Sequence, residues 1–278
     1  MEAARPIVAH YLVAVKPPAV PSPAASLVLL RDHPEHGVEV LLIQRHRASK
    51  FAAGDFVFAG GKIEADDNPH DAAAWCAGLD ATRAARVLGL PDTPATAIGY
   101  WIGAIREAFE EVGILLAYGA DGQPAQVPET RAEAYRRACQ KDNRAFWDML
   151  REERLTLATD RLVYFAHWIT PEEQPLRFDT RFFAAPAPAG QTPVADDHEI
   201  IAVRWLSPRA ALEARTRGEI SLRTPTLKNL MLLEGAATVA DALRQIGDRP
   251  VPTIRPRVVL DAAGVPVRAL LPGDPGYW

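Results

Sequence analysis

This sequence has few of the residues that mark a disulfide scaffold or a zinc site. It contains two cysteines, Cys76 and Cys139, which are far apart and form no CxxC or Cys/His pattern. A disulfide framework is therefore not indicated, and a reducing compartment fits. Seven histidines are scattered, and the only close pair, His33 and His36, flanks a proline in a polar turn. Because the usual ligand spacing is missing, the pattern does not predict a histidine metal site.

The chain also lacks an excess of positive charge and a long hydrophobic run. Its formal net charge is −4, so a broad surface that attracts nucleic-acid phosphates is not expected. The longest apolar segment near the amino terminus, IVAHYLVAV at 7–15, is too short to span a bilayer. We expect no membrane association, and the cytoplasm is the expected location because no targeting signal is recognised.

The 278 residues are 48% hydrophobic and 24% charged, which is typical of a globular protein with a sizeable core. Two apolar runs, 25–32 and 38–45, are separated by a polar loop and predict a β-hairpin. Strand patterns mixed with helical patterns predict an α/β or α+β fold with helices on both faces of a sheet. Further strands are predicted within 54–61, 161–171, 177–185 and 198–208.

The predicted organisation is a leader, a main domain and a carboxy-terminal extension. The leader, 1–24, ends in a proline-rich stretch that should be extended. The main domain, 25–235, contains two helical insertions, at 68–98 and at 129–152. The extension, 236–278, is predicted to hold a helix, a hairpin and an irregular tail.

The segment REAFEEVG, 106–113, gathers three glutamates, Glu107, Glu110 and Glu111. On a helix predicted over 97–112 these residues share one face, opposite an apolar stripe. Gly113 is predicted to end the helix, because glycine tolerates positive φ. Like charges placed in this way repel. Two interpretations follow: a solvated acidic face, or a set of oxygen ligands for a divalent cation.

The surroundings of the glutamates favour the cation. Gly61, five residues and Asp67 are followed downstream by REAFEEVGI, and together they resemble the Nudix box, G-x5-E-x7-R-E-U-x-E-E-x-G-U, where U is aliphatic. The chain departs from it in two places. Asp67 stands where the box has glutamate, and 38 residues rather than seven separate it from Arg106. An insertion of that length is tolerated if its ends lie close together.

The Nudix resemblance implies an α/β/α sandwich with a mixed sheet, and hydrolysis of a diphosphate linkage. Mg²⁺ or Mn²⁺ held by the three glutamates would neutralise charge and activate water. Arg106 would orient a carboxylate, and the backbone amides of Gly60 and Gly61 would lie against phosphate. Glu199 is the candidate general base or additional ligand, and its alternative interpretation is a solvated loop acid.

A finer resemblance concerns the substrate. Residues 41–61 are similar to the signature of coenzyme A diphosphatases: seven positions agree, among them Arg45, whereas Ser49, Ala52 and Ala59 differ. The insertion within the box, with HWITP and RFDTRFF after it, resembles the acyl-CoA diphosphatase branch. The products would be 3′,5′-ADP and (acyl-)4′-phosphopantetheine. The candidates for binding phosphate are Arg45, Arg177 and Arg181, the last two alternatively being a charged face of an edge strand.

Three functions stay open on the sequence. The first is a metal-dependent coenzyme A or acyl-CoA diphosphatase. The second is a Nudix hydrolase of ADP-ribose, NADH or a nucleoside triphosphate, and the third is a non-catalytic Nudix-fold binding module. The expected partner is a nucleotide-type small molecule of the coenzyme A class, and a homodimer is compatible with the sequence.

Overall fold

The centre of the protein is an eight-stranded sheet in which strands from both ends of the chain are neighbours. The computed structural model describes residues 17–49, 52–196, 198–261 and 266–277. Along the sheet the order is β10-β7-β8-β1-β2-β3, with β4 beside β1 and β9 beside β2. These strands are β1 (Ser22–His33), β2 (Gly37–Arg45), β3 (Phe56–Val57), β4 (Ala59–Lys62), β7 (Val163–Ile169), β8 (Phe178–Pro186), β9 (Ile200–Leu206) and β10 (Thr253–Ile254).

The sheet is mixed, as the sequence predicts. β1 pairs parallel with β8 and antiparallel with β2 and β4, and β10 is parallel to β7. The predicted hairpin of β1 and β2 is confirmed, with Leu30 opposite Val40 and His33 opposite Gly37. Both faces of β1 are covered, which explains its continuous apolar run instead of an alternating one.

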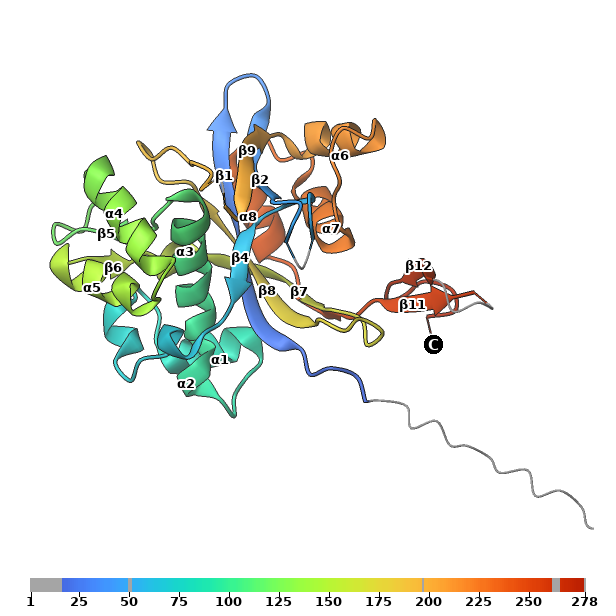
Figure 1. Ribbon diagram of the computed structural model, residues 1–278, viewed down its shortest axis with the longest axis horizontal. Helices are drawn as coiled ribbons and strands as arrows, with labels where there is room; N and C mark the ends of the chain where they lie inside the picture. Colours follow the sequence, from blue (N-terminus) through green and yellow to red (C-terminus); the bar gives the residue numbers. More distant parts are fainter. Residues whose placement is uncertain (1–16, 50–51, 197, 262–265, 278) are drawn as a thin grey trace, which may run out of the picture.

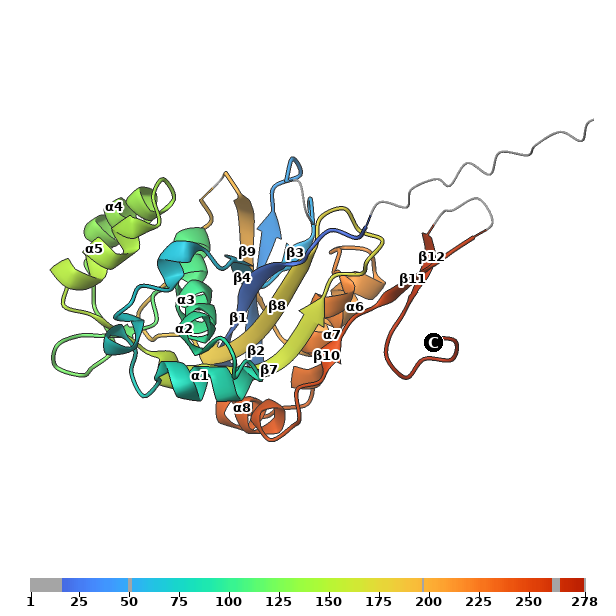
Figure 2. The ribbon, with the colours of Figure 1, turned by 90° about the horizontal axis from the view of Figure 1, so that it is seen from below.

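Helices cover both faces of the sheet (Figure 1). On one face α3 lies across β1 and β4, and its neighbours in Figure 2 are the helices of the two insertions. On the other face lie the three helices that follow β9 in the chain. The helices are α1 (Ala81–Leu88), α2 (Pro94–Ala97), α3 (Gly99–Val112), α4 (Glu129–Cys139), α5 (Arg144–Glu152), α6 (Pro208–Thr216), α7 (Thr224–Leu233) and α8 (Val239–Gly247).

Two hydrophobic cores follow from this layering. Leu27 and Leu29 of β1 point toward α3, where they join Ile105 and Phe109. The intervening residues of β1 point to the opposite face and pack with α7 and α8. Strand alternation thus divides one apolar segment between two cores.

Several boundaries differ from the predictions. The strand predicted at 54–61 is two strands: β3 pairs with β2 and β4 pairs with β1, so the chain changes partner at Phe58. β1 begins at Ser22 beside β8, so the last residues of the predicted leader are already part of the sheet. The predicted helical insertion at 129–152 is a pair of helices, α4 and α5.

The remaining elements are short. The insertion 68–98 holds α1, α2 and the 3₁₀ turn Ala72–Trp75, and a further 3₁₀ turn, Ala65–Asp67, precedes it. β5 (Ala117–Tyr118) pairs with β6 (Thr156–Leu157), and a 3₁₀ turn covers Thr159–Arg161. The predicted carboxy-terminal hairpin is formed by β11 (Arg257–Leu260) and β12 (Pro266–Leu270), at one side of the molecule in Figure 1. None of the helices in the described part of the chain is long and apolar enough to cross a membrane.

Candidate active site

The helix α3 carries the acidic segment and ends where the sequence predicts. Gly113 adopts a left-handed conformation with φ of 73°; its N–H donates to the carbonyl of Phe109, and the N–H of Ile114 donates to the carbonyl of Ala108. The acidic side of the helix is not solvated: Glu111 is buried, and Glu107 and Glu110 are half-buried. The helix is therefore enclosed on nearly all sides, and its carboxylates face other protein groups.

Arg106 lies at the centre of this acidic face and contacts three carboxylates. Its Nε donates to Asp67 Oδ1 at 2.7 Å and its Nη2 donates to Asp67 Oδ2 at 3.0 Å. Nη1 donates to Glu107 Oε1 and to Glu110 Oε2, both at 3.0 Å, and Nη2 also donates to the carbonyl of Lys62 at 3.0 Å. These five contacts match the five N–H groups of a guanidinium. Arg106 therefore fixes the positions of three carboxylates at once.

The pair of Arg106 and Asp67 is fully buried, with side-chain exposures of 2% and 1%. Burial disfavours the guanidinium charge, but the hydrogen bonds with Asp67 and the charges of Glu107, Asp67 and Glu110 raise the pKa of Arg106 above its usual value. Asp67 therefore reaches Arg106 in spite of the shorter side chain. The 38 residues between Asp67 and Arg106, which include the insertion, leave and return at points that this ion pair holds together.

Glu111 is held in place by Gly60 and Arg45. Its Oε2 accepts a hydrogen bond from the N–H of Gly60 at 2.8 Å, and Oε1 lies 3.4 Å from Nη1 of Arg45. Burial and the charge of Glu107 raise the pKa of Glu111 well above its usual value, although Gly60 and Arg45 oppose this shift. The contact with Arg45 is a link that the sequence did not reveal, since the two residues come from separate motifs.

The glycine pair makes room for these carboxylates. Gly60 has φ of 153°, and a Cβ at this position would lie 2.3 Å from the carbonyl oxygen of Ala25. A Cβ on Gly61 would lie 2.5 Å from Oε1 of Glu107. The amide of Gly60 donates to Glu111, and the contact of the Gly60 and Gly61 amides with phosphate stays a prediction.

The carboxylates fit a hard divalent cation. Burial is the main cause that raises the pKa of Glu107 and the pKa of Glu110, which rises to about 7. The charge of Arg106 opposes both shifts, and the charges of the neighbouring acids add to them. Oε1 of Glu110 is buried and has no hydrogen-bond partner in the structure. An unpartnered buried oxygen among carboxylates that resist ionisation would be stabilised by Mg²⁺ or Mn²⁺.

Glu199 lies near this centre but on an exposed loop. Its charge contributes to the raised pKa of both Glu107 and Glu111. Its backbone carbonyl accepts from the N–H of His46 at 2.7 Å, directly after β2. Asp196 shapes the loop, because its Oδ1 accepts from the N–H of Glu199 at 2.9 Å. The sequence analysis missed Asp196, although an aspartate that opens a turn is a recognisable signal.

Arg177 and Arg181 are placed differently from the prediction. β8 lies inside the sheet between β7 and β1, so these residues are not on an edge strand. Arg177 is 5% exposed and donates to the carbonyls of Thr170 and Ala19. Arg181 is 4% exposed, lies over the ring of Tyr100 and pairs with Asp179. Both guanidinium groups have partners inside the protein, although Nε of Arg181 has none, and their contact with a substrate phosphate stays a prediction.

A cavity of about 730 Å³ opens beside the signature segment. Four of its lining residues, Gln44, Arg47, Gly54 and Phe56, come from 41–61, and the others come from 215–222. Phe56 belongs to the core on the α7 and α8 side of the sheet, whereas Glu111 lies on the α3 side. The cavity and the carboxylates are therefore on opposite faces, and the cavity is not a place for the reacting diphosphate.

Comparisons with known proteins agree with this geometry. Residues 89–233, about half of the chain, match the family described as the NUDT19 Nudix domain. The human acyl-coenzyme A diphosphatase NUDT19 is 28% identical over 280 residues, which cover 89% of this chain and 74% of that protein. The Gallus gallus protein of the same name is 31% identical over 284 residues, with 86% and 72% covered. The crystal structure of a NUDIX hydrolase from Alicyclobacillus acidocaldarius is 26% identical and has a TM-score of 0.69, covering 83% of this chain and 99% of that chain.

Proposed function

This chain belongs to the Nudix hydrolase family, in the branch described as the NUDT19 Nudix domain, and on that premise we propose that it hydrolyses the diphosphate of coenzyme A or an acyl-CoA. The products are 3′,5′-ADP and (acyl-)4′-phosphopantetheine. The names of the human and chicken relatives support this substrate class. So does the contact of Arg45, from the signature segment, with Glu111 of the catalytic helix.

The observation that carries the proposal is the buried arrangement around Arg106. Glu107, Glu110 and Glu111 would hold the divalent cation, Mg²⁺ or Mn²⁺. When bound, it supplies charge neutralisation for the diphosphate and a water of lowered pKa. Arg106 keeps Glu107 and Glu110 in place through Nη1, and the N–H of Gly60 keeps Glu111 in place. The chain thus orients three carboxylates before any ligand arrives, which lowers the cost of assembling the site.

Two further side chains have roles in this proposal. Glu199 is exposed and close enough to influence Glu107 and Glu111, so it can accept the proton of the attacking water. Arg45 is 21% exposed beside Glu111 and has an Nε without a hydrogen-bond partner. The Nε atom is buried, and the exposed part of the guanidinium suits an anionic oxygen of the substrate.

The test is product analysis by mass spectrometry with coenzyme A and an acyl-CoA as substrates, in Mg²⁺ and in Mn²⁺. We expect Glu111→Gln to lower turnover by several orders of magnitude and to leave the circular dichroism spectrum unchanged. The matched control is Glu173→Gln, the same change at an exposed loop residue. ADP-ribose and NADH belong in the same panel, because faster cleavage of either would move the substrate to another class of diphosphate. A Glu111→Gln protein with nearly normal turnover would refute the site.

The proposal also includes a cytoplasmic location and a homodimer. Neither follows from the site itself. Light scattering on the purified protein measures its mass in solution, and fractionation of cells that express it measures its location. A monomeric mass or a location in another compartment would each correct one of these predictions without affecting the proposed chemistry.

A further inference from the structure

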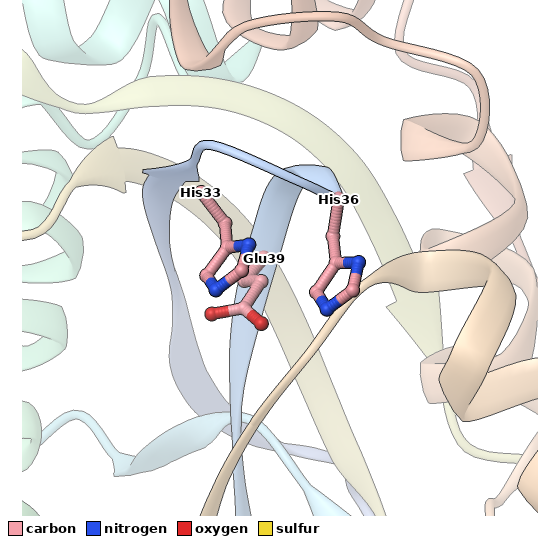
Figure 3. A group of neighbouring side chains, drawn as sticks. All are labelled: His33, His36 and Glu39. Carbon is pink, nitrogen blue, oxygen red and sulfur yellow. The ribbon is translucent and has the colours of Figure 1, made fainter.

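A second group of ligand-type side chains lies at the tip of the hairpin of β1 and β2. His33 and His36 stack with ring centroids 4.3 Å apart and planes 6° from parallel. Glu39 lies beside both rings (Figure 3). One ligand atom from each of the three residues lies within 4.8 Å of the other two, and in the described part of the chain this is the only group of three histidine, cysteine or acidic residues that meets this limit.

The register of the hairpin brings these residues together. Arg31 is paired with Glu39, and His33 is paired with Gly37 at the end of the strand. Since alternate residues of a strand share a face, His33 and Glu39 are diagonal neighbours on one face. His36 comes from the turn and adds the second ring. The sequence lacks the usual spacing of metal ligands, but cross-strand pairing in the hairpin brings these ligand side chains together.

We propose that His33, His36 and Glu39 bind a borderline transition-metal ion of the Zn²⁺, Co²⁺ or Ni²⁺ class. Two imidazole nitrogens and one carboxylate oxygen are a donor set that suits these ions and not Mg²⁺, which prefers oxygen ligands. Ligand atoms on a tetrahedral Zn²⁺ are about 3.4 Å apart when the bonds are about 2.1 Å. Because a ring nitrogen binds a metal in the plane of its ring, the stacked ring of His36 must also turn out of its parallel arrangement with His33, and His36 lies on an exposed turn that leaves room for this rotation.

Arg31 prepares the carboxylate. Its Nε and Nη2 both contact Oε2 of Glu39, at 2.8 Å and 2.7 Å, which leaves Oε1 for an ion. The guanidinium lies over the ring of Trp205, 4.5 Å from its centroid. Because Arg31 balances the charge of Glu39, the imidazoles dominate the attraction for the ion. Loss of a ring should therefore weaken binding more than neutralisation of Glu39.

The backbone next to the group supplies a reporter. The N–H of Glu35 donates to Nδ1 of His33 at 3.2 Å. A metal bound through Nδ1 removes this acceptor. A metal bound through Nε2 requires a proton on Nδ1, and a protonated Nδ1 can no longer accept the Glu35 N–H. In either case the Glu35 amide loses its hydrogen bond when the ion binds, and its NMR signal moves.

The site is fixed to the body of the protein and separate from the carboxylates of α3. Asp32 Oδ1 accepts from the N–H of Val239 at 2.7 Å, which ties the hairpin to the start of α8. His33 lies seven residues along β1 from Ser26, the partner of Gly60. This separation is about 23 Å at the rise of a β-strand. Metal binding at the tip is therefore independent of the hydrolase centre.

The test is calorimetric titration of Zn²⁺ into tag-free protein with excess Mg²⁺, which occupies oxygen-ligand sites. We expect one Zn²⁺ per chain, and affinity at least about tenfold weaker in His33→Ala and in His36→Ala, with a smaller loss in Glu39→Gln. His70→Ala, at an exposed histidine elsewhere, is the control and should bind as the wild type does. Turnover in Mg²⁺ should be unchanged in all four variants.

Three results would overturn the proposal. One is a double variant, His33→Ala with His36→Ala, that keeps its native circular dichroism spectrum and binds Zn²⁺ with wild-type affinity. Another is a Glu35 amide signal that does not move while Zn²⁺ binds, since the ion would then be elsewhere. Absence of any Zn²⁺ uptake by the wild type would have the same meaning.

Discussion

The sharpest prediction concerns the buried pair of Asp67 and Arg106. In Asp67→Asn the side chain keeps its size but loses its charge, and an amide N–H₂ then faces a guanidinium N–H. Breaking a buried ion pair by removing one partner costs about 3–5 kcal/mol. Glu107 and Glu110 still face Arg106, so we expect a loss of unfolding free energy near the lower end, about 3 kcal/mol. At roughly 2–4 °C per kcal/mol, Tm should fall by about 6–12 °C.

The assay is thermal and urea-induced unfolding followed by circular dichroism, with Asp66→Asn as the control. Asp66 is the exposed neighbour, and its backbone carbonyl accepts from the indole N–H of Trp147. We expect Asp66→Asn to unfold within about 0.5 kcal/mol of the wild type. If Asp67→Asn also stayed within that margin, the ion pair would not be holding the two ends of the insertion together. Lower turnover should accompany the lost stability, because Arg106 positions Glu107 and Glu110.

Three further predictions come from the same site and core. Burial raises the pKa of Glu110 from 4.5 to about 7, so in chelator the native state holds a proton that the unfolded state has lost between these values. The stability that Glu110 contributes through this proton is fully present below pH 4.5 and is lost as pH rises through 7. Tm should therefore fall between pH 4.5 and 7, and it should fall less in Glu110→Gln. Gly60→Ala should unfold at a clearly lower urea concentration than the wild type, because its Cβ would meet the carbonyl of Ala25 at 2.3 Å. Burial raises the pKa of Cys76 and Cys139 to about 12, so neither thiol should react with a thiol reagent at pH 8 until urea unfolds the chain; fast labelling of the native protein would contradict their burial.

The local features of the catalytic segment could be predicted from the sequence. The apolar spacing, the three glutamates and Gly113 predict helix α3 to within two residues at its start and to the residue at its end. The hairpin of β1 and β2 is equally local, since a polar loop between two apolar runs leaves few alternatives. These elements depend on side chains within a few positions of each other, and a linear pattern records such relations directly.

Relations between distant segments needed the tertiary structure. The sequence shows Asp67 and Arg106 but not that they form a two-bond pair across the insertion. The sequence leaves open that Arg177 and Arg181 form a charged face of an edge strand, whereas the sheet order puts β8 inside the sheet and both arginines are buried.

The sequence by itself determined the helix, its acidic residues and the type of chemistry, because these depend on residue type and short-range periodicity. The tertiary structure alone decided which charges are buried and paired, and that His33 and Glu39 are diagonal neighbours across a hairpin. Burial and cross-strand contact depend on which strands become neighbours, and that choice is made by the packing of the whole chain.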